Sequence, residues 1–141
     1  MGRAGIIGTR VNSFVGIPWA RGGHDLDPNG AGADCWGLTR AVLELAGLQV
    51  SDPWETFRDL ILEEIRAGGD TSVFCPDELE GVRLDDLKRL DVIYFGRRTG
   101  NHYGLVGEDR YVLTTCKGRG SHLVELRRAL RTARSGWRVR V

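Results

Sequence analysis

The sequence predicts an α+β fold in which helices come first and an antiparallel sheet follows. Before about residue 80 apolar residues recur at helical spacing, and after it they alternate in short strand-like runs. Helices and strands that are segregated in this way are typical of α+β folds rather than of alternating α/β folds. The 141 residues are 41% hydrophobic and 28% charged, so we expect one domain over 1–141 with a single core.

Three helices are expected in the first half of the chain. A short one is predicted over 4–15, and the clearest over 34–47, with Asp34 as the N-cap and Gly47 as the stop. Its buried side is predicted to consist of Leu38, Val42, Leu45 and Ala46. The third is predicted over 52–69, where Asp-Pro opens the sequence and Gly-Gly closes it.

Short strands are expected in the second half. The runs rich in Val, Leu, Tyr and Phe lie at 91–95, 102–107, 110–115 and 122–126. Gly-Glu-Asp-Arg between the middle two predicts a tight hairpin. The last residues, 127–141, are predicted to form one turn of helix and a final strand.

Composition excludes several classes of protein. A net charge of +1 and the lack of any nucleic-acid-binding signature argue against a nucleic-acid partner. No apolar run approaches the roughly 18 residues of a membrane span, so no membrane insertion is expected. The first residues lack the apolar core of a signal peptide, and we therefore expect folding in a cytoplasm.

Cys35 is a candidate nucleophile because it stands where the second helix begins. A thiol attacks as thiolate, its ordinary pKa is about 8.5, and a helix N-terminus favours the charged form. Such a nucleophile also needs a proton carrier. The chain has three histidines, His24, His102 and His122, of which His102 opens a rigid strand. The alternative is that Cys35 only packs, as most free cysteines do.

Several motifs together resemble those of the NlpC family of cell-wall cysteine peptidases. They are VGIPWARGG, GADCWGLTRAVLELAGL, LDVIYFG and NHYGLVGEDRYVLTT, and their order and spacing agree with the family over about residues 5–126. The resemblance implies a reduced papain-like fold and no metal or cofactor. Trp after the cysteine, in DCWGL, is similar to the versions carried by phage tails, which implies a virion protein made in the host cytoplasm.

The resemblance also assigns roles to residues of this chain. Cys35 matches the nucleophile and His102 the base. The positions that correspond to the family's substrate groove are Trp19, Gly22, Gly23 and Asp34.

The third catalytic position departs from the family pattern. It is usually His, Asn or Gln about twelve residues after the base, and here it is Thr114. A one-residue change in strand register would present Thr115 instead. Three readings stay open: Thr114 orients His102 as a weaker hydrogen-bond partner, His122 or another residue replaces it, or the site has decayed.

Two functions follow from the resemblance. The first is a phage-tail peptidase that cleaves an amide bond of the peptidoglycan stem peptide, in this family usually between D-glutamate and a diamino acid, and so helps the tail penetrate the host wall. The second is a structural tail-tip component of the same fold with little or no activity, in contact with other tail proteins. An acyltransferase of the same broad fold would need a lipid groove.

Three further features have simpler explanations. Cys75 and Cys116 lack the spacing of zinc ligands relative to Cys35. The loop 22–34 lacks the ligand order of a calcium loop and is interpreted as a rim of the groove. The six arginines between 127 and 140 either bind an acidic partner or form a solvated face while Trp137 and Val139 turn inward.

Overall fold

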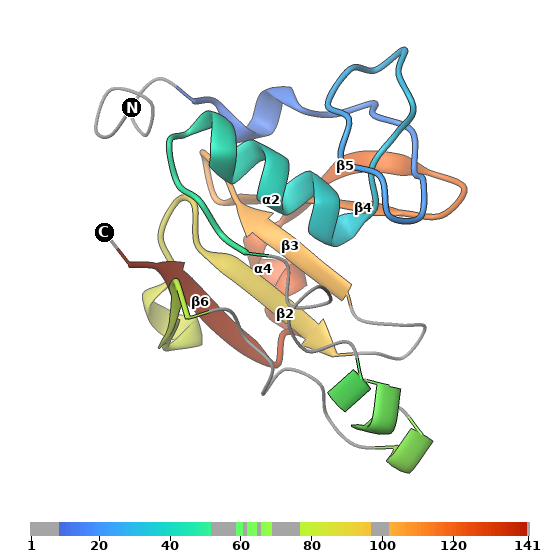
Figure 1. The fold of residues 1–141 in the computed structure, drawn as a ribbon. Helices are drawn as coiled ribbons and strands as arrows, with labels where there is room; N and C mark the ends of the chain where they lie inside the picture. Colours follow the sequence, from blue (N-terminus) through green and yellow to red (C-terminus); the bar gives the residue numbers. More distant parts are fainter. Residues whose placement is uncertain are drawn as a thin grey trace.

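The computed structural model describes residues 9–51, 59, 60, 62–64, 66–68, 77–96 and 102–140 (Figure 1). Its centre is one antiparallel sheet with the strand order β1-β6-β2-β3-β4-β5. The strands are β1 Leu79–Val82, β2 Val92–Gly96, β3 His102–Val106, β4 Tyr111–Cys116, β5 Gly120–Glu125 and β6 Ser135–Val139. The helices are α2 Cys35–Leu45 and α4 Leu126–Ala129, with 3-10 turns η1 Val11–Ser13 and η3 Leu84–Asp86. The predicted α+β class is confirmed.

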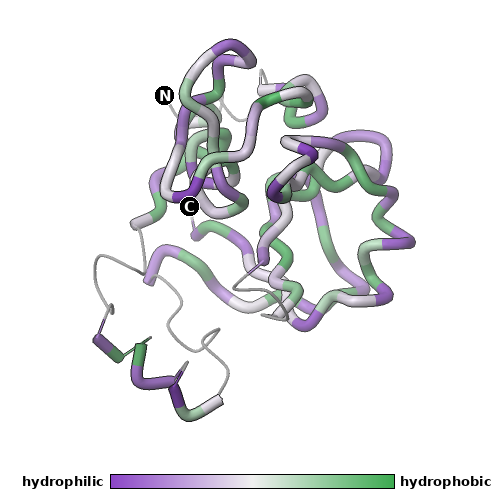
Figure 2. Tube along the Cα trace, turned by 90° about the vertical axis from the view of Figure 1, so that its right-hand side faces the viewer, coloured by the Kyte–Doolittle hydropathy of each residue, from purple (hydrophilic) through white to green (hydrophobic). Residues whose placement is uncertain are grey.

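The two faces of the sheet are covered by different helices. Leu105 and Leu113 pack in one apolar cluster with buried residues of α2. Their neighbours Val106 and Val112 pack in a second cluster with α4. Because successive strand residues point to opposite faces, both faces need apolar side chains. Hydrophobic and hydrophilic stretches accordingly alternate along much of the chain (Figure 2).

Helix α2 starts and ends where the sequence predicts. The Asp34 carboxylate accepts a hydrogen bond from the Gly37 N–H at 2.7 Å, which is a standard N-cap bond. At the other end Gly47 has a φ of 83°, the left-handed conformation that stops helices. The predicted stripe is wrong at Leu45, which is 50% exposed. Leu43 is fully buried instead, so the apolar face is rotated away from Leu45.

The predicted first helix is wrong in the part that the structure describes. Only the three-residue turn η1, Val11–Ser13, is helical between residues 9 and 15, and residues 4–8 lie outside the described residues. The backbone N–H groups of Val11 and Asn12 donate to the Glu108 carboxylate at 3.1 Å each. A tertiary partner therefore takes the N–H groups that could have joined a longer helix.

The third predicted helix is confirmed where the structure describes it, whereas the first strand of the sheet was not predicted. Residues 59–60, 62–64 and 66–67 are helical, as expected, and the rest of 52–69 lies outside the described residues apart from Gly68. Strand β1 was not predicted, because its four residues at the sheet edge show little alternation of apolar and polar side chains.

Among the described residues no helix has the length and apolarity needed to cross a membrane.

The C-terminal segment forms one turn of helix, α4, and a final strand, β6, which lies between β1 and β2; a turn of helix and a strand are what the sequence predicts. Val139 is 7% exposed and Trp137 packs against the first apolar cluster. Arg138 is not part of a solvated face, since its guanidinium holds the buried Asp91 carboxylate through contacts of 2.9 and 2.8 Å. The backbone N–H of Lys88 also donates to Asp91, at 2.8 Å. This pair fixes β6 to the start of β2.

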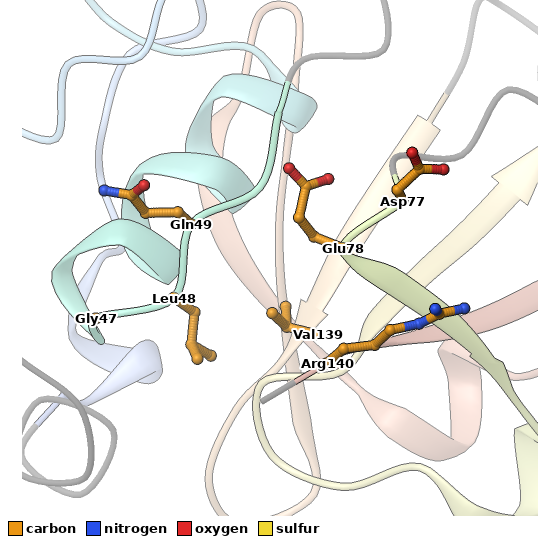
Figure 3. A pocket seen from close by; sticks show the side chains of 7 residues that line it. All are labelled: Gly47, Leu48, Gln49, Asp77, Glu78, Val139 and Arg140. Atoms are coloured by element: carbon orange, nitrogen blue, oxygen red, sulfur yellow. The ribbon is translucent and has the colours of Figure 1, made fainter.

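A cavity of about 440 Å³ lies at the C-terminal end of α2. It is lined by Gly47, Leu48, Gln49, Asp77, Glu78, Val139 and Arg140 (Figure 3). Charged side chains at its rim make it unlike a lipid groove. Cys35 lies at the opposite end of the same helix, so this cavity is separate from the candidate nucleophile.

Candidate active site

Cys35 is the first residue of α2, and its thiol meets the start of β3. The backbone N–H groups of Tyr103, Trp36 and Cys35 itself lie close enough to this thiol to lower its pKa. His102, the residue before Tyr103, opens the strand. The helix start and the strand start lie at the same end of the molecule (Figure 1). The Cys35 thiol thus lies near the backbone of the residue that follows His102 in β3.

The expected stabilisation of a thiolate at Cys35 is wrong for this structure. Burial raises the pKa of the thiol to about 11, well above its ordinary value. The N–H of Tyr103 lowers the pKa, the negative charge of Asp34 raises it, and the helix N–H groups offset only a small part of the burial. The resting thiol is therefore protonated at neutral pH.

His102 is also uncharged at rest. Its ring is half-buried and lies 5.2 Å from the ring of Phe95, measured between centroids. Burial lowers the pKa of His102 below the ordinary 6.5, and the positive charge of His122 lowers it further. A neutral imidazole is the form of histidine in which a base can accept a proton.

Thr114 fixes which nitrogen of His102 carries the proton. The Thr114 Oγ1 atom lies 3.2 Å from Nε2 of His102 and donates to the Tyr103 carbonyl oxygen at 2.8 Å. A hydroxyl has one proton, and a carbonyl only accepts, so the bond to His102 must be accepted by Thr114. The hydrogen-bond network thus assigns the neutral tautomer with Nε2–H, and Nδ1 is left as the basic atom.

The strand register selects Thr114 over Thr115. In the β3–β4 pair Leu105 faces Leu113 and Val106 faces Val112. The same register, extended by one residue, places Thr114 opposite Gly104. Thr114 is therefore diagonal to His102 on the same face. Thr115 points to the other face, where its buried hydroxyl has no hydrogen-bond partner among the described residues.

Neither of the other histidines takes the place of Thr114. His122 is the direct partner of Thr114 on β5, but its Nδ1 lies 2.8 Å from the carbonyl oxygen of Gly120 and so donates there. It acts on His102 only through its charge. His24 is exposed and forms an isolated bridge with Ala33 in the loop before α2.

The loop before α2 is attached to the helix start through Asp34. One carboxylate oxygen accepts from the Gly22 N–H at 2.7 Å and the other from the Gly37 N–H at 2.7 Å. A Cβ on Gly37 would collide with the carbonyl oxygen of Gly23, and a Cβ on Gly23 would collide with that of Gly32. The predicted loop glycines thus allow backbone to lie directly against the helix start. Asp34, Gly22 and Gly23 all border Cys35.

Trp19 is half-buried in the segment that leads into this loop. Its neighbours hold the loop closed, because Ala33 N–H donates to the Pro18 carbonyl at 2.9 Å and Ala20 N–H donates to the Ala33 carbonyl at 3.4 Å. The structure therefore places Trp19 beside the residues that precede Cys35. Its role in a substrate groove stays a prediction.

Sequence reasoning missed Tyr103, which joins the three candidate catalytic residues. Its N–H contacts the Cys35 thiol and its carbonyl receives the Thr114 hydroxyl. Its ring packs on Trp36, with centroids 4.9 Å apart, and on Tyr94, with centroids 5.3 Å apart. Tyr103 contacts Cys35 and Thr114 through its backbone, which is the same for every residue type except proline. The sequence could therefore have indicated this role only through the position of Tyr103 directly after His102.

The described residues contain no group of three or more His, Cys, Asp or Glu side chains arranged to hold a metal ion. Cys116 is exposed at the end of β4, and Cys75 lies outside the described residues. Cys116 follows Thr114 by two residues and so shares its face of the strand.

Comparison with known proteins identifies the fold. No family model matches the sequence, and no curated protein is significantly similar to it. Solved structures do match. The NlpC/p60 domain of the peptidoglycan hydrolase SagA aligns over 100% of both chains with a TM-score of 0.60 and 17% identity. The chain has the NlpC/p60 fold.

Two further NlpC/p60-like structures align with nearly all of this chain. The peptidoglycan hydrolase RipB from Mycobacterium tuberculosis gives a TM-score of 0.60 at 20% identity, over 99% of this chain and 68% of that one. An NlpC/p60 family protein from Bacillus cereus gives 0.63 at 17% identity, over 96% of this chain and 39% of that one. The chain thus spans about two fifths of the Bacillus protein. The resemblance seen in the motifs is confirmed at the level of fold.

Proposed function

We propose that the protein is a peptidoglycan peptidase that uses Cys35 as nucleophile and His102 as base. The observation that carries the proposal is the arrangement around Tyr103, whose backbone lies near the Cys35 thiol and accepts a hydrogen bond from Thr114, the residue bonded to His102. Two of the structural neighbours are named as peptidoglycan hydrolases, which supports the substrate class. The sequence motifs support a cysteine peptidase in particular.

The reaction starts from a neutral pair. Nδ1 of His102 removes the Cys35 proton as the sulfur attacks an amide carbonyl of the stem peptide, and an S–C bond forms. The backbone N–H of Cys35 at the helix start donates to the developing oxyanion. The imidazolium then gives its proton to the leaving amine, the C–N bond breaks, and water hydrolyses the thioester with His102 again as base.

Thr114 supplies orientation without charge. It accepts from Nε2–H and keeps Nδ1 free for the thiol. The family's usual His, Asn or Gln would do the same through a nitrogen or amide oxygen. A neutral hydrogen bond of this kind is worth about 1 kcal/mol, so the substitution is compatible with catalysis at a reduced rate.

The bond that we propose is the amide between D-glutamate and the diamino acid of the stem peptide. A digest of purified Gram-negative peptidoglycan and of released stem peptides, followed by mass spectrometry, tests this directly. The wild type should release a new stem fragment, and Cys35→Ala and His102→Ala should not. If folded wild type and both variants leave the same products, the protein is not a peptidase of this substrate.

We further propose that the protein works at the tip of a phage tail, with other tail proteins as partners, after synthesis in the host cytoplasm. The support is the sequence DCWGL from Asp34 to Leu38, where Trp36 takes the place usual for Ser. Trp36 packs on Tyr103 beside Cys35, so it adds apolar contact where Ser would be polar. Antibody labelling of particles by electron microscopy should mark the tail tip, and labelling confined to lysate without particles would contradict this.

A structural tail-tip component with little activity is the second candidate. It is favoured by the protonated, buried Cys35 thiol and by Thr at the third position. The two candidates predict different digests, since a structural component leaves the stem peptide intact. They also differ for Thr114→His, which would restore cleavage only if the rest of the site is competent.

A further inference from the structure

The turn between β4 and β5 carries two exposed cations. Residues 116–119 are all exposed, and the turn is closed by the Arg119 N–H, which donates to the Cys116 carbonyl at 3.2 Å. Lys117 and Arg119 lie on either side of Gly118, which has a φ of 86°. A tight turn with a left-handed glycine holds its flanking residues in a defined place on the surface.

This turn borders the candidate active site on two sides. It begins at Cys116, two residues after Thr114 along β4. It then enters β5 at Gly120, where an added Cβ would come within 2.6 Å of the Ile17 carbonyl oxygen. Ser121 N–H donates to that same oxygen at 2.8 Å. The chain from Ile17 continues within two residues to Trp19 and the loop before Cys35.

The acidic groups of the neighbouring loop are already engaged by backbone. The Asp25 carboxylate accepts from the N–H groups of Asp27 at 2.9 Å and Ala31 at 3.1 Å, and these bonds lower the pKa of Asp25. Asp27 accepts from the Asn29 N–H at 2.9 Å. Both oxygens of Asp34 also accept backbone N–H groups.

Neither cation of the turn takes part in an ion pair with another described residue. Within the described part of the chain, ion pairs join Arg83 to Asp85, Arg89 to Glu108, Arg127 to Glu125 and Arg138 to Asp91. None involves Lys117 or Arg119. The turn therefore carries two positive charges that no carboxylate of the described residues pairs with.

We infer that Lys117 and Arg119 form a cationic rim that binds a carboxylate of the substrate peptide. The inference rests on the proposed function and deepens it. It predicts that the site binds a stem peptide with free carboxylates more tightly than the same peptide with those groups converted to amides. Arg and Lys donate several charge-assisted hydrogen bonds to a carboxylate, and an amide removes the charge. Both side chains are exposed, so each contact contributes little binding free energy. We therefore expect the preference for the carboxylate to be severalfold rather than several orders of magnitude.

Binding rather than turnover provides the test. Full-length Cys35→Ala is titrated calorimetrically with a synthetic stem tripeptide that has free carboxylates, and with the same tripeptide as its carboxamide. We expect the carboxylate form to bind about three- to tenfold more tightly, an advantage that 0.5 M salt reduces. Adding Lys117→Gln and Arg119→Gln should bring the two dissociation constants together while the Tm is unchanged.

The matched control is Arg128→Gln with Arg131→Gln, which removes two exposed arginines beyond the far end of β5. This control should retain the preference for the carboxylate. Equal binding of the two peptides, no binding of either, or a preference that survives Lys117→Gln and Arg119→Gln would overturn the inference. Failure of the proposed peptidase is seen separately, as intact stem peptide after incubation with the wild type.

Discussion

The hydroxyl of Thr114 accepts a hydrogen bond from Nε2 of His102, at 3.2 Å, because its own proton is donated to the carbonyl of Tyr103. One short side chain thereby sets both the tautomer and the direction of the candidate base. A threonine can orient the base in place of the usual His, Asn or Gln when its hydroxyl is held in this way. The bond to Tyr103 supplies that constraint.

Thr114→Val keeps the shape of the side chain and removes the hydroxyl. We expect kcat/KM for the stem peptide to fall about tenfold, since a neutral hydrogen bond of about 1 kcal/mol is lost and His102 is free to adopt the other tautomer. Thr114→Ser retains the hydroxyl and should stay within about threefold of the wild type. Equal activity of the Val and Ser variants would contradict the orienting role.

The Cys35 thiol should be slow to react near neutral pH. With a pKa of about 11 it is almost wholly protonated at pH 7, and burial restricts access. Iodoacetamide followed by peptide mapping should label the exposed Cys116 first, and labelling of Cys35 should accelerate as pH rises toward 11. Rapid labelling of Cys35 at pH 6–7 would show that the thiol is ionised there.

The same pKa predicts an alkaline loss of stability. The thiol ionises near 9.0 in the unfolded chain and near 11 in the folded protein. Between these values the unfolded chain loses its proton first, so folding weakens as pH rises. The folded state should lose about 3 kcal/mol through that window. Cys35→Ala shares every other titrating group, so the difference between the two pH profiles isolates this thiol.

The ion pair of Asp91 with Arg138 should stabilise the fold. Asp91→Asn leaves the partly buried guanidinium without its charged partner, and the free energy of unfolding should fall by about 2–3 kcal/mol. The matched control is Asp85→Asn, which breaks the exposed pair with Arg83, whose side chain is 83% exposed. That control should change stability by less than about 0.5 kcal/mol in urea unfolding. Similar losses in both variants would argue against an anchoring role for Asp91.

Gly37 should not tolerate a side chain. In Gly37→Ala the new methyl group would collide with the Gly23 carbonyl and push the loop away from the helix start. We expect a loss of at least about 2 kcal/mol in unfolding free energy, together with loss of activity. Gly81→Ala is the control, because its Cβ would lie 3.8 Å from the nearest atom, on Trp137. A stable, active Gly37→Ala would mean that the loop does not depend on this contact.

Sequence patterns predicted the elements whose signals are local. The helix at Asp34 has both a cap and a stop, and the strands after residue 80 alternate clearly, so their bounds agree with the structure within about two residues. In the described part of the helix predicted over 4–15, only η1 is helical, because the N–H groups of Val11 and Asn12 bind Glu108, about a hundred residues away. Nothing in the local sequence encodes that partner.

The candidate site was predictable only in part for the same reason. Motif order located Cys35, His102 and Thr114, and the register brings the last two together. The protonation state of Cys35 was not predictable, since a helix N-terminus favours thiolate while burial, which depends on the tertiary fold, opposes it more strongly. The role of Tyr103 runs through its backbone and leaves no pattern.

The proposed mechanism depends most on the protonation state of His102, and the ring nitrogens of this residue can be observed directly. Long-range 1H–15N spectra of the labelled wild type and of Thr114→Val, recorded across a pH titration, measure both the tautomer and the pKa. In the wild type we predict a proton on Nε2, an unprotonated Nδ1 and a pKa below 6.5, with Thr114→Val populating both tautomers. A wild-type ring protonated on Nδ1, or one whose tautomer is unaffected by loss of the Thr114 hydroxyl, would contradict the proposed base and its orientation.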